Sequence, residues 1–474
     1  MDFFKVKKSY INKKGYVINK KDYNPKLIDE IKKELTVTPN INEDYGVKAV
    51  PYKVYLEGPN KLYLPKYYAI KKLGPAKSKI FEGYDIDVSF NGSIREGQKE
   101  AVERTLNQMY TKGGGLLSLP CGKGKTVISL YILSQLKKKT LVIVNQEFLM
   151  DQWIERINMF LPDMRVGKVQ RDKVQVEGYD ISLAMLKSLS KRDYGKDAFK
   201  NIGFVIVDEC HNVATKEYSK ALQKICSKYM LGLSATPTRK DGLTKVIKWF
   251  IGDLFMKSVD ERKLEVSVER YIMNYDDARY NKVLLNYRQK PFIAKMITNI
   301  AEYIPRNDFI IDRIYDILKT KDAQVLILSE RLSQLKYIYE KINDKELVGY
   351  FVGKMKAHER EESMTKRVIL GTFHIAREAL DIKTLNTLIL ATPKSDIIQA
   401  VGRIMRTNYG NHLILDIIDN FSSFARQSKI RQKLYKNRDY DIKTFMVSPD
   451  NIIDKDNFIN DKKSIKIDYS KSLF

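Results

Sequence analysis

The stretch Ser118–Leu130 reads SLPCGKGKTVISL and joins a glycine-rich loop to the start of a predicted helix. The apolar run LLSLP before the loop is typical of a buried β-strand, and KTVISLYILSQLKK after it has helical periodicity. Gly122 and Gly124 flank a lysine, and glycines let backbone N–H groups come close to a bound anion. A strand, a glycine loop and a helix in this order predict a phosphate-binding loop.

The loop also carries the side chains that a bound nucleoside triphosphate requires. Lys125 would reach the β- and γ-phosphates, and the hydroxyl of Thr126 would bind Mg²⁺. The usual spacing G-x-x-x-x-G-K-T fails at its first glycine, because that position is Leu119. The loop alone is therefore only moderately specific, and a glycine-rich turn with a chance GKT sequence is the alternative.

A second chemical element is FVIVDECH, Phe204–His211, in which an apolar strand ends in two adjacent carboxylates. Asp208 would hold Mg²⁺, mostly through water, and Glu209 would polarise the attacking water. Open parallel sheets bind ligands at the carboxyl ends of their strands, where both this pair and the glycine loop are expected. Cys210 in this element and Cys121 in the loop are interpreted as packing residues rather than nucleophiles.

Short apolar runs alternate with helix-period segments along most of the chain. The runs cover 116–120, 140–146, 181–186, 204–209 and 230–236, and then 325–330, 350–353, 367–372, 387–393 and 412–418. Continuous apolar runs are typical of parallel strands buried on both faces, and their alternation with helices indicates a doubly wound sheet. The sequence therefore predicts an α/β protein with two such lobes in tandem.

The predicted domain boundaries follow changes in this pattern. Residues 1–90 lack a nucleotide motif and are expected to form a small N-terminal accessory domain, and residues 91–258 the first lobe. A charged stretch, 259–305, is interpreted as a linker or insertion, 306–445 as the second lobe, and 446–474 as a polar tail. The basic segment 420–440 is expected to form a helix that packs on the second lobe, with binding of a partner as the alternative.

The accessory region interleaves tyrosines with lysines in PYKVYLEGPNKLYLPKYYAIKK, Pro51–Lys72. Aromatic rings among lysines can stack on bases while the ammonium groups hold phosphates. A short hairpin with tyrosines on its core face explains the same pattern equally well. The sequence leaves both interpretations open, so a role in nucleic-acid or partner binding is one of two hypotheses for this domain.

Composition restricts the class of protein. Lys and Arg number 84 against 58 Asp and Glu, which gives a net charge of +26 and favours polyanionic partners, although a lysine-rich solvated surface is an alternative. No apolar run is long enough for a membrane helix, and the first residues contain no apolar segment typical of a secretory signal. Three cysteines without metal or disulfide spacing fit a reducing, intracellular compartment.

Taken together and in order, these elements resemble the motifs of superfamily 2 helicases and translocases over about residues 95–435. In the first lobe, IREGQKEAV resembles the Q-motif, LPCGKGKT motif I, TLVIVNQEFLMDQW motif Ia, DECH motif II and LGLSATPTRKDG motif III. In the second lobe, VLILSERLSQL resembles motif IV, GTFHIAREALDI motif V and QAVGRIMR motif VI. The resemblance implies two RecA-like lobes and an ATP hydrolase that acts on nucleic acid.

The resemblance also implies a role for each matched residue. ATP would contact Arg95 and Gln98 at its adenine, Asp381 in the second lobe, and the loop residues Pro120, Cys121, Gly122, Lys123, Gly124, Lys125 and Thr126. Mg²⁺ would bind at Thr126 and Asp208. Catalysis would use Lys125, Asp208 and Glu209, with Gln399, Arg403 and Arg406 reaching across from the second lobe. Coupling would fall to His211, Ser234, Ala235 and Thr236, and nucleic-acid contacts to Gln146, Arg239 and Thr372.

Within the superfamily, DECH and SATPTRKDG resemble the branch that contains XPB-type and UvrW-type enzymes and the transcript-release helicases of large cytoplasmic DNA viruses. The sequence departs from XPB at Lys240, where a charge is reversed, and has alanine at positions 379 and 400. The expected function is an ATP-dependent helicase or translocase, on DNA rather than RNA, with viral transcription termination and an RNA polymerase partner as an expected setting. The alternatives are an RNA helicase and a nucleic-acid-binding ATPase switch that does not unwind. A monomer, in host cytoplasm or virion if viral, is expected.

Overall fold

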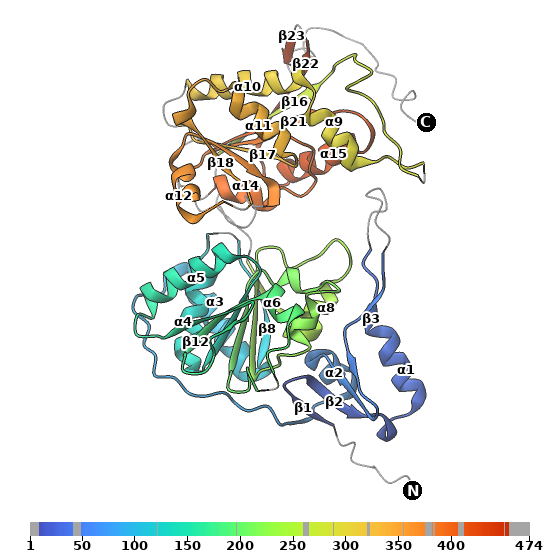
Figure 1. Cartoon of the computed structure of the whole chain (residues 1–474), viewed down its shortest axis with the longest axis vertical. Coiled ribbons are helices and arrows are strands. Elements are labelled where there is room, and N and C mark those ends of the chain that lie inside the picture. Colours follow the sequence, from blue (N-terminus) through green and yellow to red (C-terminus); the bar gives the residue numbers. More distant parts are fainter. Residues whose placement is uncertain are drawn as a thin grey trace. The chain divides into compact units, whose positions relative to one another are not determined.

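The computed structural model describes residues 9–40, 49–120, 122–195, 197–258, 265–287, 289–319, 323–353, 355–374, 382, 384–405, 412–449 and 451–454 (Figure 1). The predicted site residues Cys121, Asp381 and Arg406 lie outside these ranges. The chain divides into two compact units, one formed by the described residues up to Ser258 and one from Glu265 on. Among the described residues, no helix combines the length and the apolar character needed to cross a membrane.

The sheet of the first unit has the strand order β11-β10-β12-β9-β13-β14-β8-β15, and only β11 runs antiparallel to its neighbour. The five predicted runs form β8 (Gly114–Ser118), β9 (Thr140–Val144), β12 (Ile181–Met185), β13 (Phe204–Val207) and β14 (Tyr229–Ser234). The sequence did not predict the outer strands β10 (Val166–Gln170), β11 (Lys173–Val174) and β15 (Leu254–Lys257). β10 alternates buried and half-buried residues because it lies near the sheet edge, so it lacks the continuous apolar run of the central strands.

Helices cover both faces of this sheet, as the doubly wound prediction requires. Consecutive residues such as Leu116 and Leu117 belong to two different hydrophobic clusters, because side chains alternate between the faces of a strand. One cluster includes α3 (Glu96–Lys112), α4 (Lys125–Leu136) and α5 (Glu147–Phe160), and the other includes α6 (Leu186–Lys191), α7 (Ser219–Leu222) and α8 (Thr244–Ile251).

The accessory region is a five-stranded sheet with two helices, and it belongs to the first unit. Its strand order is β5-β6-β2-β1-β7, made of β5 (Leu56–Glu57), β6 (Lys61–Leu64), β2 (Gly15–Asn19), β1 (Tyr10–Asn12) and β7 (Lys77–Ser78). The helices are α1 (Pro25–Glu34) and α2 (Lys66–Leu73), and β3 (Thr36–Val37) pairs with β4 (Tyr52–Lys53) in a separate two-stranded sheet. The described part of this region therefore forms a small α/β module within the first unit.

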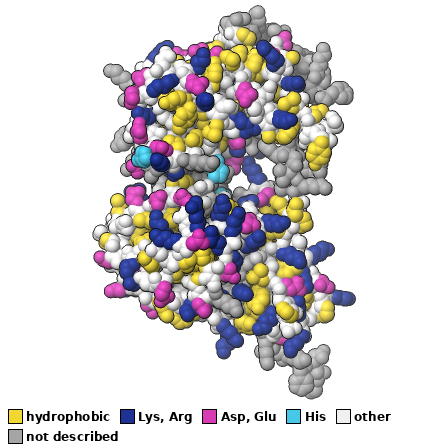
Figure 2. All heavy atoms as spheres, in the orientation of Figure 1, with side chains coloured by type: hydrophobic (Ala, Val, Ile, Leu, Met, Phe, Trp, Pro, Cys, Tyr) yellow, Lys and Arg dark blue, Asp and Glu magenta, His cyan; other side chains and the backbone are white. Residues whose placement is uncertain are grey.

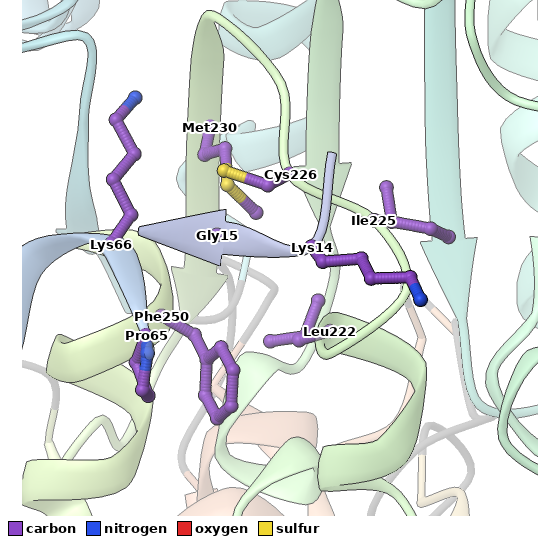
Figure 3. Close-up of a pocket in the computed structure, with 9 residues that line it drawn as sticks. All are labelled: Lys14, Gly15, Pro65, Lys66, Leu222, Ile225, Cys226, Met230 and Phe250. Carbon is purple, nitrogen blue, oxygen red and sulfur yellow. The ribbon is translucent and has the colours of Figure 1, made fainter. Parts of the chain in front are cut away.

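This module packs directly on the first lobe. Lys66 is buried at 9% exposure, and its ammonium donates to the carbonyl oxygens of Ser227 (3.4 Å) and Lys228 (3.2 Å), which precede β14. The ring of Tyr68 meets that of Trp249 edge-on, with centroids 5.4 Å apart. Figure 3 shows a small pocket at this junction, lined by Lys14, Gly15, Pro65 and Lys66 of the module and by Leu222, Ile225, Cys226, Met230 and Phe250 of the lobe.

The second unit repeats the parallel architecture, with the strand order β18-β19-β17-β20-β21-β16-β22-β23. The five predicted runs form β17 (Val325–Ser329), β18 (Val348–Phe351), β19 (Val368–Thr372), β20 (Thr387–Leu390) and β21 (His412–Asp419). The remaining strands are β16 (Val266–Met273), β22 (Asp441–Ser448) and β23 (Asn451–Asp454), and only β23 is antiparallel. Its helices include α9 (Ile293–Ala301), α10 (Ile304–Leu318), α11 (Leu332–Lys341), α12 (Ala357–Thr365), α14 (Ile398–Ile404) and α15 (Ser422–Lys436).

Two predicted boundaries of the second lobe are wrong. The stretch 259–305 is no linker, because β16 lies inside the sheet between β21 and β22, and α9 adds to the core. The sequence VSVERYIM concealed this strand because Arg270 is charged, yet its guanidinium is buried and donates to Ser428 on α15. The predicted tail 446–474 likewise begins too early, since β22 and β23 continue the sheet to Asp454.

The basic segment 420–440 packs on the second lobe as predicted. It forms α15, which buries Phe424, Arg431 and Tyr435. The guanidinium of Arg431 donates to the carboxylate of Asp416 on β21 at 2.9 Å, so a cation that the sequence shows as part of a basic surface is instead paired in the core.

Candidate nucleotide-binding and hydrolysis site

Four predicted elements meet at one edge of the first sheet. The strands β9, β13, β14 and β8 are neighbours in that order and run parallel, so their carboxyl ends lie side by side. Gln146 follows β9, Asp208 follows β13, Ser234 ends β14, and the glycine loop follows β8. The sheet therefore brings together residues that are far apart in the sequence, at the edge where open parallel sheets bind ligands.

The glycine loop has the backbone of a phosphate cradle. Gly122 and Gly124 have φ of +78° and +77°, a conformation that side chains disfavour, and α4 begins at Lys125 directly after Gly124. The N-terminal N–H groups of α4 thus point toward the loop and favour an anion there. Lys125 Nζ donates to the carbonyls of Leu119 (3.0 Å) and Pro120 (3.4 Å), which holds its charge over the loop, next to Lys123 and Thr126.

Gln98 of the predicted Q-motif lies against this loop. Its side-chain amide donates to the carbonyl of Lys123 (3.3 Å), and its oxygen accepts the backbone N–H of Arg95 (3.2 Å) at the start of α3. A Cβ on Gly124 would lie only 2.2 Å from Gln98 Nε2, so a larger residue would displace the Gln98 amide from the loop, and the positive φ of Gly124 would add backbone strain. Gln98 thus supports the loop, while Arg95 is exposed, and the adenine contacts of both residues stay predictions.

Asp208 has a defined donor on each carboxylate oxygen. The indole Nε1 of Trp153 donates to Oδ2 at 2.9 Å, and the backbone N–H of Glu209 donates to Oδ1 at 2.9 Å. Burial first, and then the Glu209 carboxylate, raise the pKa of Asp208 to about 6, against the opposing effects of Trp153 and Lys125. Sequence reasoning assigned no role to Trp153, although the residue stands in the quoted motif Ia segment.

Glu209 turns the chain away from the strand. Its φ of +43° is uncommon for a residue with a side chain, and the chain enters a short 3-10 turn, Cys210–Val213. Cys210 is fully buried, and burial raises the pKa of its thiol, so its packing interpretation agrees with the structure. Glu209, with its left-handed backbone, therefore lies between β13 and the 3-10 turn, and its carboxylate contacts the His211 ring.

His211 connects this segment to the SAT segment at the end of β14. Its Nδ1 lies 3.2 Å from Glu209 Oε2 and 3.1 Å from the Ser234 hydroxyl oxygen. Ser234 also accepts the backbone N–H of Thr236 at 3.1 Å, with Ala235 between them. A chain of contacts therefore runs from the predicted catalytic carboxylate to the predicted coupling residues.

Arg239 faces the interior of the first lobe. Its guanidinium forms a two-point ion pair with Asp241 and donates to the carbonyl oxygen of His211. Tyr52 of the accessory module adjoins this ion pair, and burial raises its pKa to about 12, with Asp241 adding to the rise. All three guanidinium nitrogens have partners within the first unit, so the predicted nucleic-acid contact of Arg239 stays a prediction.

The second unit carries the remaining predicted residues. Gln399 and Arg403 lie on α14 and are buried at 5% and 8% exposure, and Thr372 ends β19 at a half-buried position. All three residues belong to the second unit. Thr372 ends β19, and α14, which carries Gln399 and Arg403, packs on β20 of the same sheet. Their predicted roles toward ATP and nucleic acid remain untested, as does that of Gln146, which begins α5 in the first unit.

The residues at the first sheet edge fit Mg²⁺. Mg²⁺ prefers oxygen ligands and usually binds through one or two carboxylates together with substrate phosphates. Asp208 and Thr126 supply such oxygens, and a divalent cation would stabilise the ionised Asp208 carboxylate, which burial and the neighbouring Glu209 carboxylate disfavour. Within the described ranges, no group of three or more His, Cys, Asp or Glu side chains is arranged to hold a metal ion.

The lysines and tyrosines of Pro51–Lys72 divide between the two interpretations. Tyr52, Tyr55 and Tyr68 are buried at 6% and belong to the core. Tyr63 instead lies on the other face of the sheet, where it and Tyr10 flank Val17 across the strands. Lys14 sits 5.2 Å from the Tyr63 ring centroid, and Lys61 and Lys79 sit 5.6 Å and 4.5 Å from that of Tyr10. The core interpretation therefore holds for most of the tyrosines, and one cationic aromatic face remains.

Comparison with protein families agrees with this geometry. The family described as "Type III restriction enzyme, res subunit" matches residues 91–239, which hold the glycine loop and DECH. The family described as "Helicase conserved C-terminal domain" matches residues 309–408, which hold motif VI. The two matches fall on the first and second lobes, respectively.

Individual proteins extend the comparison to the whole chain. A protein of Acanthamoeba polyphaga mimivirus, named as an ATP-dependent RNA helicase, is 35% identical and covers 97% of this chain and 91% of its own length. A protein of Sulfurisphaera tokodaii, named as a DNA 3'-5' translocase of XPB type, is 26% identical over 72% of this chain and 84% of its own length. The DNA-bound restriction-modification enzyme LlaBIII shares the fold with a TM-score of 0.54 at 16% identity, over 75% of this chain and 32% of that one. The chain belongs to the superfamily 2 helicases of the type found in large DNA viruses, and is a nucleic-acid-dependent ATPase with two RecA-like lobes.

Proposed function

We propose that this helicase is a Mg²⁺-dependent, ATP-driven motor that moves on duplex DNA. The DECH and SATPTRKDG sequences support this choice, because they are the forms that resemble XPB-type enzymes, and the translocase of Sulfurisphaera tokodaii is named for DNA. The mimivirus relative is named for RNA, which makes RNA the second candidate substrate. The net charge of +26 fits either polyanion.

The residues of the first lobe would act as follows in this mechanism. The loop N–H groups and Lys125 bind the β- and γ-phosphates, which orients the terminal phosphoryl group. Bound Mg²⁺ would supply positive charge beside the phosphates, and Thr126 and Asp208 would hold it. Glu209 orients the attacking water and accepts its proton, and His211 and Ser234 transmit the change at Glu209 to the SAT segment.

The second lobe would complete the reaction. Arg403 and Arg406 are proposed to stabilise charge on the γ-phosphate when ATP draws the lobes together. Gln399 would assist them in catalysis, and Asp381 would contact the bound nucleotide. Arginines in this role contribute about 10³–10⁵ in turnover in other phosphoryl-transfer enzymes. Loss of the phosphate would release the lobes, and repetition of this cycle would advance the enzyme, with Gln146, Arg239 and Thr372 as candidate strand contacts.

One observation carries the proposal: the glycine loop, DECH and SAT lie on adjacent strand ends of one sheet. The test measures ATPase rate for the wild type and Lys125→Ala without nucleic acid and with single-stranded DNA, duplex DNA or RNA. We expect duplex DNA to stimulate the wild type most and Lys125→Ala to be inactive. Lys220→Ala, an exposed lysine of α7 paired with Glu217 and outside the matched motifs, is the control and keeps full activity. Stimulation by RNA alone would favour the second candidate.

A nucleotide switch that does not unwind is the other alternative. The presence of Glu209 and of Arg403 argues against a switch, because a switch need not keep hydrolytic residues. A strand-displacement assay and a triplex-displacement assay on duplex DNA separate the cases. ATP hydrolysis without either displacement would contradict the motor proposal.

We propose transcript release in a DNA virus that replicates in host cytoplasm as the setting. The mimivirus relative, aligned over nearly the full chain, supports the viral setting. An elongation complex of RNA polymerase stalled on DNA would release its RNA when the helicase and ATP are added. If a helicase that is active as a motor releases no RNA, transcript release is rejected as the setting and the motor proposal is unaffected. The enzyme is expected to act as a monomer, which analytical ultracentrifugation would check.

The cationic aromatic face of the accessory module is proposed as an additional nucleic-acid contact. It consists of Tyr10 and Tyr63 with Lys14, Lys61 and Lys79 over their rings. On the face of the molecule drawn in Figure 2, further Lys and Arg side chains gather on the upper part of the first unit. Tyr10→Ala with Tyr63→Ala should weaken DNA binding about tenfold or more, because each stacked ring contributes about 1–3 kcal/mol. Unchanged binding would reject this contact.

A further inference from the structure

The indole N–H of Trp153 donates to the carboxylate that is expected to bind Mg²⁺. Trp153 lies on α5, is 1% exposed and belongs to the hydrophobic cluster on that face of the first sheet. Its Nε1 is 2.9 Å from Asp208 Oδ2. The ring is therefore fixed by apolar packing, while its one polar atom is directed at the end of β13.

This contact limits the rotation of the carboxylate. The terminal torsion of an aspartate is broad when nothing constrains it. Here the backbone N–H of Glu209 holds Oδ1 at 2.9 Å, and Trp153 holds Oδ2 from a different element. Two fixed donors define the carboxylate plane, and the remaining lone pairs of both oxygens stay available for a metal ion or its water.

We propose that Trp153 is a positioning residue for Mg²⁺ binding, which orients Asp208 through this hydrogen bond. The inference rests on the proposed role of Asp208 in holding Mg²⁺. Partners that orient metal ligands typically contribute 10–100-fold to metal affinity or activity. The competing explanation is a core tryptophan whose N–H has found an acceptor, as buried tryptophans usually do.

The decisive variants remove the N–H and keep the ring volume. Trp153→Phe does so approximately, and replacement of Trp153 by β-(3-benzothienyl)alanine does so with an isosteric ring. Trp249→Phe is the matched control, because Trp249 packs on Tyr68 at the accessory module. Thermal unfolding of the nucleotide-free proteins reports whether each variant is folded.

The first readout is direct metal binding. Mn²⁺ binding to the wild type and variants in the presence of ADP is measured by electron paramagnetic resonance. We expect both position-153 variants to bind Mn²⁺ about 10–100-fold more weakly, and Trp249→Phe to match the wild type. Unchanged Mn²⁺ affinity in a folded benzothienyl variant would overturn the proposal and leave Trp153 as a core residue.

The second readout separates metal binding from turnover. In ATPase assays, the Mg²⁺ concentration at half-maximal rate should rise about tenfold or more in Trp153→Phe, while the rate at saturating Mg²⁺ changes much less. A fall in maximal rate with no change in the Mg²⁺ requirement would contradict the positioning role. A wild type without nucleic-acid-dependent ATPase activity would instead contradict the proposed function, whatever the Mn²⁺ result.

Tryptophan fluorescence supplies a third readout, because the chain contains only two tryptophans. In Trp249→Phe, all indole emission comes from Trp153. Titration of Mg²⁺ at fixed ADP should change this emission with the same midpoint as metal binding, and ADP with EDTA should not. Emission that does not respond to Mg²⁺ would count against a contact between Trp153 and the metal ligand.

Discussion

His211 Nδ1 lies 3.1 Å from the hydroxyl oxygen of Ser234, so the turn that follows β13 meets the end of the neighbouring strand β14 through two side chains, one from DECH and one from SAT. Ser234 also accepts the N–H of Thr236, and His211 also contacts Glu209. A change in the charge around Glu209 during hydrolysis would thus alter the position of the SAT segment. This contact joins the DECH segment to the predicted coupling residues of the SAT segment.

Ser234→Ala should separate hydrolysis from movement. The variant loses the hydroxyl that joins His211 to Thr236 but keeps Lys125, Asp208 and Glu209. We expect the ATPase rate to stay within about threefold of the wild type and strand displacement per ATP to fall about tenfold, roughly the 1.4 kcal/mol that one hydrogen bond contributes.

The control for this prediction is Ser182→Ala. Ser182 is a buried serine of the same sheet, and its hydroxyl donates to the carbonyl of Gln175 at 2.8 Å. We expect Ser182→Ala to lose about as much free energy of unfolding as Ser234→Ala, but to keep the wild-type amount of strand displacement per ATP. Equal loss of hydrolysis and displacement in Ser234→Ala would show that Ser234 acts in catalysis rather than coupling.

Gly124→Ala should abolish tight nucleotide binding. The new Cβ would meet Gln98 Nε2 at 2.2 Å, and φ of +77° adds backbone strain of about 1–2 kcal/mol. Gly178→Ala is a close control, because Gly178 has φ of +75° and no atom within 4 Å of the added Cβ. Equilibrium binding of a fluorescent ATP analogue checks the prediction.

The same position offers a rescue experiment. Shortening the opposing side chain in Gly124→Ala with Gln98→Ala removes the clash but not the backbone strain. Partial recovery of ATP binding in this double variant is expected. If Gly124→Ala and Gly178→Ala both leave ATP binding unchanged, the close packing of the loop on Gln98 is unimportant.

Much of the fold follows from the sequence because its central strands are buried on both faces. All ten predicted runs contribute to strands, and α4 (Lys125–Leu136) covers most of the helix predicted after the glycine loop. Two of the strands that the sequence missed contain polar residues for specific reasons. β10 lies near an edge, and β16 contains Arg270, whose charge suggested a linker although its guanidinium is buried against α15.

The site was predictable where chemistry requires particular residues and unpredictable where packing decides. Glycines before a Lys-Thr pair and paired acids after a strand together predict phosphate and metal chemistry, and the structure brings them to nearby strand ends of one sheet. The contacts of Trp153 with Asp208 and of Gln98 with Lys123 join segments far apart in the chain, and no spacing rule reveals them. The assignment of Arg239 to nucleic acid likewise could not foresee its ion pair with Asp241.

Arg306→Met should strongly destabilise the second unit. Arg306 and Asp419 form a two-point ion pair with both side chains at 0% exposure, and the Tyr280 hydroxyl donates to the same carboxylate. Removing one partner leaves a buried charge without compensation, which typically costs about 3–5 kcal/mol. Urea denaturation would measure the loss in free energy of unfolding.

An exposed ion pair serves as the comparison for this prediction. Arg104 and Glu100 are 57% and 65% exposed on α3, so Arg104→Met should change the free energy of unfolding by less than about 1 kcal/mol. The additional variant Arg306→Met with Asp419→Leu removes both charges and should recover part of the stability. A loss for Arg306→Met as small as that for Arg104→Met would disprove the importance of the buried pair.

The junction between accessory module and first lobe should grow more stable with alkaline pH. Burial lowers the pKa of Lys66, whereas in the unfolded chain this lysine titrates near its ordinary value of about 10.4. Between these two values the unfolded chain binds more protons than the folded one. The Lys66 contribution to the free energy of unfolding therefore rises with pH in this window.

Comparison with Lys66→Met isolates this contribution. Cys226 lies beside Lys66, so both proteins carry Cys226→Ala to remove thiol titration. Urea denaturation at a series of alkaline pH values up to about 10.4 should give a free energy of unfolding that increases with pH for the lysine protein relative to the methionine protein. A difference that is constant across this range would mean that Lys66 is no harder to protonate in the folded protein.

Salt should weaken DNA binding, and the slope should depend on the accessory face. Each phosphate contact contributes about 0.9 to the fall of log K with log salt on duplex DNA. Lys61→Ala with Lys79→Ala should therefore lower the slope by up to about 1.8 if both ammonium groups reach phosphates. Lys72→Ala is the control, because Lys72 is paired with Glu30 and Glu34 and is expected to contact no phosphate. If neither variant changes the slope, other cationic residues make the phosphate contacts. If the affinity of the wild type for DNA does not depend on salt, the surplus of positive charge belongs to an ordinary solvated surface.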